Sequence, residues 1–154
     1  MEQCDIPDNE VAARQQGAVR IESSRTSMID QLLLESRRGL DRVQASDLER
    51  EMAAGALVVD TRPADQRDRD GVLPGAVIID RNVLEWRLDP SSPYRLPVAD
   101  DAARRIVVVC NEGYSSSLAA HTLQRLGLTR ATDLIGGFQA WSALRKHQPH
   151  LPAQ

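Results

Sequence analysis

The chain reads Ile106-Val107-Val108-Val109-Cys110-Asn111-Glu112-Gly113-Tyr114-Ser115-Ser116 at the point that constrains its fold most. The first four residues are apolar and β-branched, which is typical of a strand that is buried on both faces. Leu118, Leu123 and Leu126 follow at helical spacing, so a helix is expected next. The segment between them, residues 110–116, is called the cysteine loop below. It therefore joins the end of a strand to the start of a helix.

Cys110 at such a junction is a candidate reactive thiol. Backbone amides at the start of a helix are unpaired and lie at the positive end of the helix dipole, so they can hold a thiolate, a persulfide or an oxyanion. A cysteine in this position is expected to have a lowered pKa. The alternative is a structural residue, because cysteine is among the most buried residue types and can end a strand by chance.

Strand and helix patterns alternate along the chain. Apolar runs predict strands at residues 57–59, 76–79, 106–109 and 131–135, and the run at 76–79 is expected to be buried. Ser46 is expected to cap a helix that stops at Gly55. Asn82 is expected to cap a short helix, and residues 100–105 to form another. This order predicts an α/β protein with a mainly parallel sheet and helices on both faces.

The chain is expected to divide into a flexible head, an amphipathic helix, one domain and a loose tail, at residues 1–25, 26–39, 40–146 and 147–154. The head is polar, lacks periodicity and contains Cys4. The helix starts with a capping box at Ser27 and Asp30. Its apolar stripe is expected to pack on the domain, with a second subunit as the alternative.

Composition narrows the class of protein. At 154 residues with 27% charged residues, the chain fits one soluble domain plus an extension. It has no apolar run long enough to span a membrane and no signal-peptide pattern, so a cytoplasmic location without a membrane partner is expected. A net charge of −3 without a basic stripe makes nucleic acid an unlikely partner. The two cysteines and three histidines do not cluster, so neither a disulfide framework nor a metal site is expected.

Two cysteine chemistries are disfavoured by the residue types present. A cysteine hydrolase needs a histidine beside the thiol, but the three histidines lie far along the next helix or in the tail. A tyrosine phosphatase needs an arginine six positions after the cysteine, and Ser116 stands there. Glu112 also adds a negative charge to the loop, which opposes a phosphate dianion.

Four segments follow one another in a recognisable order: Leu57-Val58-Val59-Asp60-Thr61-Arg62, Gly71-Val72-Leu73-Pro74-Gly75-Ala76, the cysteine loop, and Ile135-Gly136-Gly137-Phe138-Gln139-Ala140-Trp141. Together they resemble the rhodanese, or thiosulfate sulfurtransferase, family over residues 40–146. The resemblance implies a rhodanese-like domain with a mainly parallel central sheet of about five strands. Because no segment repeats, it implies a single-domain member.

The resemblance also implies a reaction without a cofactor. Cys110 would attack the outer sulfur of a donor such as thiosulfate and become a persulfide, and a thiol or cyanide acceptor would remove that sulfur. The cysteine loop would supply the substrate-binding residues, namely Asn111, Glu112, Gly113, Tyr114, Ser115 and Ser116. Arg81 is a further donor-binding candidate, because active sites of parallel sheets lie at the carboxyl ends of strands. The alternative for Arg81 is a surface salt bridge.

Glu112 leaves two other interpretations open, because many family members carry a basic residue in this loop. One is a rhodanese-like binding or redox-sensing module that does not catalyse a reaction. The other is a sulfur relay that receives sulfur from a donor protein, such as a cysteine desulfurase, and passes it to a cofactor or tRNA pathway. Both the relay and the thiosulfate enzyme would use the same persulfide.

Two pairs of residues are expected to support the site. Asp60 and Arg62 match the family's paired charges at a strand end and are interpreted as structural, bracing neighbouring loops. Trp86 and Trp141 are candidates for the pocket wall. Their alternative place is the core, which is where aromatic residues at helical spacing usually lie, and this is favoured for Trp141.

Overall fold

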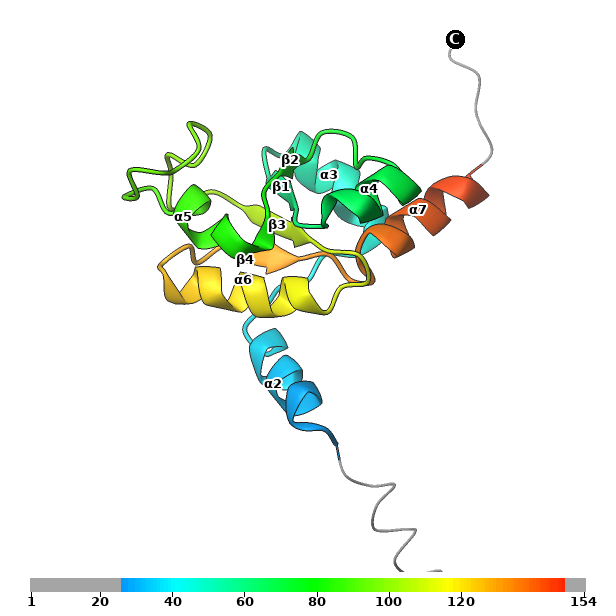
Figure 1. The fold of residues 1–154 in the computed structure, drawn as a ribbon, viewed down its shortest axis with the longest axis horizontal. Coiled ribbons are helices and arrows are strands. Elements are labelled where there is room, and N and C mark those ends of the chain that lie inside the picture. Colours follow the sequence, from blue (N-terminus) through cyan, green and yellow to red (C-terminus); the bar gives the residue numbers. More distant parts are fainter. Residues whose placement is uncertain (1–25, 149–154) are drawn as a thin grey trace, which may run out of the picture. The chain divides into compact units, whose positions relative to one another are not determined.

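The computed structural model describes residues 26–148 (Figure 1). The expected flexible head with Cys4 lies outside the described residues, as do residues 149–154 of the expected tail. Two units are distinguished, residues 1–32 and residues 33–154. The helix α2, Met28–Arg37, begins in the first and ends in the second. At its start the Asp30 amide donates to the Ser27 hydroxyl at 3.2 Å, as the capping box predicts.

A parallel sheet of four strands forms the centre of the second unit. The strands are β1 (Leu57–Asp60), β2 (Val77–Ile78), β3 (Ile106–Val109) and β4 (Ala131–Asp133). Their order in the sheet is β2-β1-β3-β4, and every pair is parallel. The predicted parallel α/β fold is confirmed, with four strands instead of about five. Beyond these strands, Val43 forms one isolated parallel bridge with Leu134, next to the end of β4.

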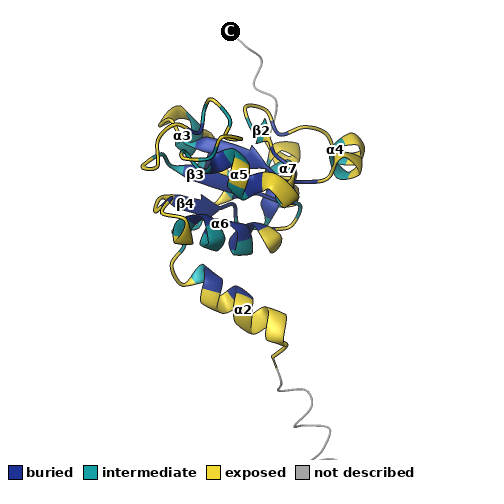
Figure 2. Cartoon of the chain, turned by 60° about the vertical axis from the view of Figure 1, so that its left-hand side comes forward, coloured by how far each residue is buried: buried dark blue, intermediate teal, exposed yellow. Residues whose placement is uncertain are grey.

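The two central strands are buried on both faces because their side chains alternate between two cores (Figure 2). Val59 and Val108 point into one core, which is covered by α5 (Leu84–Leu88) and α6 (Ser115–Arg125) with Leu84, Leu88, Ala119, Ala120 and Leu123. Val58 and Val107 point into the other, which is covered by α3 (Leu48–Ala53) and α7 (Gly137–His147) with Leu48, Met52, Phe138 and Trp141. The run at 76–79 was expected to be a buried strand, but β2 is an edge strand and Ile78 is 53% exposed.

The helices and helical turns of the domain are short. They are η1 (Ala45–Asp47), α3 (Leu48–Ala53), α4 (Ala64–Asp70), η2 (Arg81–Val83), α5 (Leu84–Leu88), α6 (Ser115–Arg125) and α7 (Gly137–His147). His147, assigned to the tail from sequence, is the last residue of α7. In the part of the chain that the structure describes, no helix is both long and apolar enough to cross a membrane.

Three local predictions were wrong, each at a place where short side chains bond to nearby amides or a turn precedes a helix. Ser46 is not an N-cap, because it lies inside the 3₁₀ turn that leads into α3. Asn82 lies inside η2, and the cap is Asp80, whose carboxylate accepts from the Asn82 amide at 2.8 Å. Residues 100–105 form turns and no helix, because Asp101 accepts from the Ala103 amide and competes with helical bonding.

Candidate active site

The cysteine loop lies at the carboxyl edge of the sheet, where the ends of parallel strands meet. Cys110 follows β3 directly, and α6 begins at Ser115. The neighbouring strand β1 ends beside it, and the Thr61 amide and hydroxyl both donate to the Val109 carbonyl, at 2.8 and 3.0 Å. The predicted strand-to-helix junction is therefore present, with the residues after β1 next to it.

The sulfur of Cys110 is surrounded by polar hydrogen-bonding groups. The amides of Gly113 and Ser116 donate to Sγ at 3.2 and 3.4 Å, and the Ser116 hydroxyl lies 3.2 Å from it. Burial of this side chain by itself raises the pKa of the thiol, but the Ser116 and Ser115 hydroxyls and the two amides outweigh it. The pKa of Cys110 is therefore lower than that of an ordinary cysteine.

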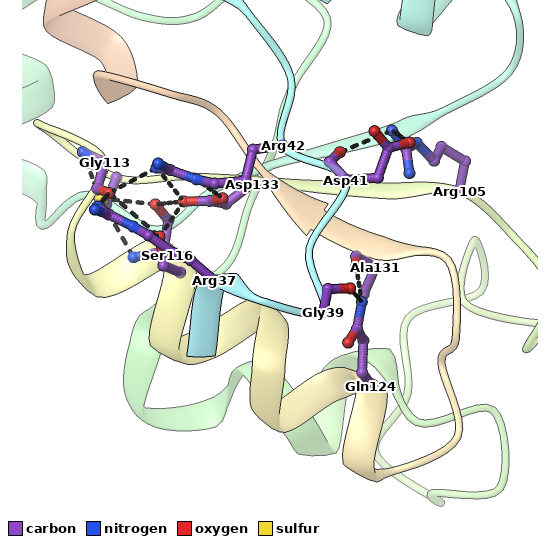
Figure 3. Close-up of polar contacts among 12 residues, drawn as sticks. Arg37, Gly39, Asp41, Arg42, Arg105, Gly113, Ser116, Gln124, Ala131 and Asp133 are labelled. Atoms are coloured by element: carbon purple, nitrogen blue, oxygen red, sulfur yellow. Dashed lines mark hydrogen bonds and ion pairs between the residues drawn. The ribbon is translucent and has the colours of Figure 1, made fainter. Parts of the chain in front are cut away.

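The amides can face the sulfur because the loop's carbonyl groups are bonded on the outside. The carbonyls of Cys110 and Asn111 accept from the first amides of α7, those of Phe138 and Gln139, at 2.8 and 3.0 Å. The Gly113 carbonyl accepts from Arg37 Nη2 at 2.8 Å and from Arg42 Nη2 at 3.1 Å (Figure 3). Other loop amides have no acceptor within residues 26–148, among them those of Asn111, Glu112 and Tyr114.

Gly113 is needed for this arrangement for two reasons. Its φ of +83° lies in the left-handed region that residues with a side chain rarely adopt. A Cβ atom there would also lie only 2.7 Å from the Gly136 amide nitrogen. Because of this close approach, the segment before α7 packs directly on the loop.

A surface pocket of about 460 Å³ opens onto the loop. Its lining residues are Thr61, Arg62, Pro63, Gln66, Cys110, Asn111, Glu112, Tyr114 and Ser115. Five of the eight site residues named from sequence thus line one pocket. Gly113 and Ser116 lie behind it against the sulfur. Arg81 does not line it, and instead forms an ion pair with Glu85 at 2.8 Å.

Sequence reasoning missed the wall that the end of β1 and α4 contribute. The signal was available, because Thr61 and Arg62 follow a strand that neighbours β3, and the carboxyl ends of such strands meet. Arg62 is also structural, as predicted. Its guanidinium binds the Asp60 carboxylate at 2.7 Å, donates to the Gly71 carbonyl at 2.9 Å and stacks 3.6 Å from the Phe138 ring centroid. The loop after α4 is therefore braced against β1.

A buried carboxylate behind the loop was also missed. Asp133 ends β4 and is fully buried, and Arg42 binds both of its oxygens, at 2.8 and 3.1 Å (Figure 3). The hydroxyls of Ser116 and Ser117 donate to its Oδ2 atom at 2.8 and 2.7 Å. An acidic residue inside a predicted strand was the sequence signal, since buried charges need partners.

Neither tryptophan lines the pocket. Trp141 is partly buried and packs on Phe138, with ring centroids 5.4 Å apart, which agrees with the favoured core interpretation. Trp86 is 57% exposed and lies near Leu126 on another surface. The wall of the pocket is therefore made mostly of polar side chains.

Fold and site together define a parallel α/β domain with a single cysteine held by backbone amides at a strand-to-helix junction. The model of the rhodanese-like domain matches residues 44–144. The chain therefore belongs to the rhodanese-like family, as the sequence motifs predicted.

Known proteins that are similar to the chain include the following three. An adenylyltransferase and sulfurtransferase of Zea mays is 34% identical over 96 residues, which are 62% of this chain but only 19% of that protein. A protein of unknown function from Rhodopseudomonas palustris, named a possible tyrosine phosphatase, is 31% identical with a TM-score of 0.70, over 79% of this chain and 94% of its own. A human single-domain sulfurtransferase shares the fold, at 24% identity and a TM-score of 0.56, over 70% of this chain and 97% of its own.

Proposed function

We propose that the protein is a sulfurtransferase that carries sulfur as a persulfide on Cys110. The thiolate attacks the outer sulfur of a donor, the sulfur bond of the donor breaks, and its leaving group departs with the electron pair, as sulfite if the donor is thiosulfate. A thiol or cyanide acceptor then attacks the outer sulfur of the persulfide. This breaks the new sulfur bond and regenerates the thiolate.

The observation that carries this proposal is the ring of donors around Sγ at the base of a surface pocket. Fixed amides stabilise negative charge without rearranging during the reaction, so the thiolate needs no histidine beside it. The unpaired amides of Asn111, Glu112 and Tyr114 are further donors for the outer sulfur of a persulfide. The membership of the rhodanese-like family supports the same chemistry.

The charges of the pocket support a donor other than a small dianion. Arg62 is the cationic residue among the described lining residues, and Asp60 neutralises it. Glu112 adds a negative charge to the same lining. We therefore expect slow reaction with thiosulfate, whose two charges lie on one small ion, and faster reaction with a peptide-bound or protein-bound persulfide, whose carboxylates lie farther from the reacting sulfur. Such a preference would make the protein a sulfur relay. The name of the maize relative, which joins an adenylyltransferase to a sulfurtransferase, agrees with a relay.

The name of the Rhodopseudomonas relative raises phosphatase chemistry as a competitor. A phosphatase needs a guanidinium that grips the phosphoryl oxygens. In the described chain, Arg37 and Arg42 contact the loop but donate to the outward-facing Gly113 carbonyl. Arg62 lines the pocket, but its guanidinium is bound to the Asp60 carboxylate. Hydrolysis of p-nitrophenyl phosphate that depends on Cys110 would favour this competitor.

The test of the proposal is the intact mass of the protein after incubation with a sulfur donor. We expect the gain of one sulfur atom with glutathione persulfide, and a smaller fraction of modified protein with thiosulfate. Cys110→Ala should abolish the gain. Cys4→Ala is the matched control and should retain it, because the chain has only these two cysteines.

Two results would contradict the proposal. One is an unchanged mass with every donor, which would favour the non-catalytic binding or redox-sensing module. The other is a persulfide that neither cyanide nor a thiol removes, since transfer requires both half-reactions. The relay hypothesis, in turn, is contradicted if thiosulfate modifies the protein as fast as glutathione persulfide does.

A further inference from the structure

We infer that Asp133 acts on Cys110 through the hydroxyl of Ser116, whose single hydrogen is shared between the sulfur and the buried carboxylate. Asp133 is thereby a positioning residue that adjusts how readily the thiol ionises. This inference deepens the proposed function, and rests on it only in taking Cys110 as the reactive thiol.

The contacts form an unbroken line from the pocket to the interior. Ser116 Oγ lies 3.2 Å from Cys110 Sγ on one side and 2.8 Å from Asp133 Oδ2 on the other. Ser116 and Asp133 are both fully buried, so water does not stand in for either contact. The hydroxyl therefore has two neighbours and one hydrogen to offer.

The position of that hydrogen depends on the state of the thiol. In the neutral form the thiol donates to Ser116 Oγ, and Ser116 donates to the Asp133 carboxylate. When the thiol proton leaves to water in the pocket, both neighbours of Ser116 are acceptors, and its hydrogen turns to the sulfur. Asp133 Oδ2 stays bonded, because the Ser117 hydroxyl and Arg42 Nη2 donate to the same atom at 2.7 and 3.1 Å.

The charged groups around the sulfur have opposite effects on the ionisation of the Cys110 thiol. Behind the loop, Asp133 opposes the thiolate, while Arg42 and Arg37 favour it. From the pocket side, Glu112 opposes it, and the Arg62–Asp60 pair at the end of β1 is close to neutral. Because thiolates lose nucleophilicity as their pKa falls, a carboxylate that limits ionisation keeps the sulfur reactive.

The experiment is the rate of iodoacetamide labelling against pH, in a Cys4→Ser background so that Cys110 is the one thiol. Asp133→Asn removes the negative charge and should lower the pKa of Cys110 by about one unit. Arg42→Gln should raise the pKa by a similar amount. Ser116→Ala should also raise it, because the thiolate loses its hydroxyl donor.

Opposite shifts distinguish this role from a structural one. Asp133→Asn and Arg42→Gln break the same ion pair, so a loop that merely loosened would move both pKa values toward that of a free cysteine. Such a common direction would overturn the inference. If Asp133→Asn does not fold, Arg42→Gln and Ser116→Ala still test it, and an unchanged pKa in both would overturn it.

A double variant tests the path through Ser116. In the Ser116→Ala background, Asp133→Asn should shift the pKa by clearly less than it does alone, because the hydroxyl that couples the two sites is gone. An equal shift in both backgrounds would mean that Asp133 acts by charge alone, which contradicts the shared hydrogen. Thr132→Val is the control on the same strand and should leave the pKa unchanged. Labelling needs no sulfur donor, so these results hold even if no persulfide forms.

Discussion

Gly137 begins α7 with a φ of +60°, and its missing side chain leaves room for the cysteine loop. A Cβ atom at this position would lie 2.4 Å from the Cys110 carbonyl oxygen and 2.8 Å from that of Asn111. Those carbonyls are the groups that the α7 amides hold on the outside of the loop. At the scale of the residue, the shape of the cysteine loop therefore depends on the absence of a Cβ atom at the first residue of α7.

We expect Gly137→Ala to lower the free energy of unfolding by about 2–5 kcal/mol, since strain at positive φ adds to overpacking. Gly127→Ala is the matched control. Gly127 has a φ of +98° but nothing within 4 Å of its would-be Cβ, so only the strain of about 1–2 kcal/mol applies. Urea unfolding measures both variants. Equal losses would mean that the close contact with the loop contributes nothing.

At the scale of elements, the end of β1 is held in place by a buried ion pair. The side chains of Arg62 and Asp60 are 0% and 1% exposed. Arg62 joins three elements, since it binds Asp60 after β1, the carbonyl of Gly71 after α4, and the ring of Phe138 on α7. The pocket wall thus depends on an interaction that has little access to water.

Arg62→Met should lower the free energy of unfolding by about 3–5 kcal/mol, because it leaves the Asp60 carboxylate buried without a cationic partner. Arg50→Met provides the comparison. Its ion pair with Asp47 is exposed, with 78% of the Arg50 side chain accessible, and should contribute no more than about 1 kcal/mol. Denaturant titrations of the two variants measure the difference. Similar losses of unfolding free energy would mean that the buried Arg62–Asp60 pair contributes no more than the exposed pair.

At the scale of the whole domain, segments far apart in the chain converge on the cysteine loop. Arg37 ends α2 and donates to Ser117 Oγ at 3.0 Å and to the Gly113 carbonyl at 2.8 Å. Arg42 reaches the same carbonyl from the segment before η1. The loop is therefore held partly by residues that precede the matched family region, residues 44–144.

We expect Arg37→Met to speed hydrogen exchange of the amides in residues 110–117 while global stability changes little, because its contacts are with the loop and not with the core. Arg38→Met is the control next to it, since the Arg38 side chain is exposed. Exchange followed by mass spectrometry compares the two. If Arg37→Met leaves loop exchange at the rate of Arg38→Met, the arginine does not order the loop.

Local patterns predicted much of this architecture. The apolar runs at 57–59 and 106–109 identified the two central strands, and the pattern that follows them predicted Cys110 at the strand-to-helix junction. Local patterns failed where a turn precedes a helix, as at Ser46, and where a side chain competes for a nearby amide, as at Asp101. They also failed where burial depends on position in the sheet, as at Ile78. The same limitation applied to Arg81, whose ion pair with Glu85 lies away from the pocket.

The sequence by itself determined the order of strands and helices, the family and the place of Cys110 at a strand-to-helix junction. These depend on apolar periodicity and on short motifs, which act between residues close together in the chain. Only the tertiary structure decided what surrounds the sulfur. Arg42 and Asp133 are 91 positions apart, and they meet behind the loop because parallel strands bring distant segments to one edge of the sheet. The electrostatic setting of Cys110 is therefore a property of the folded domain.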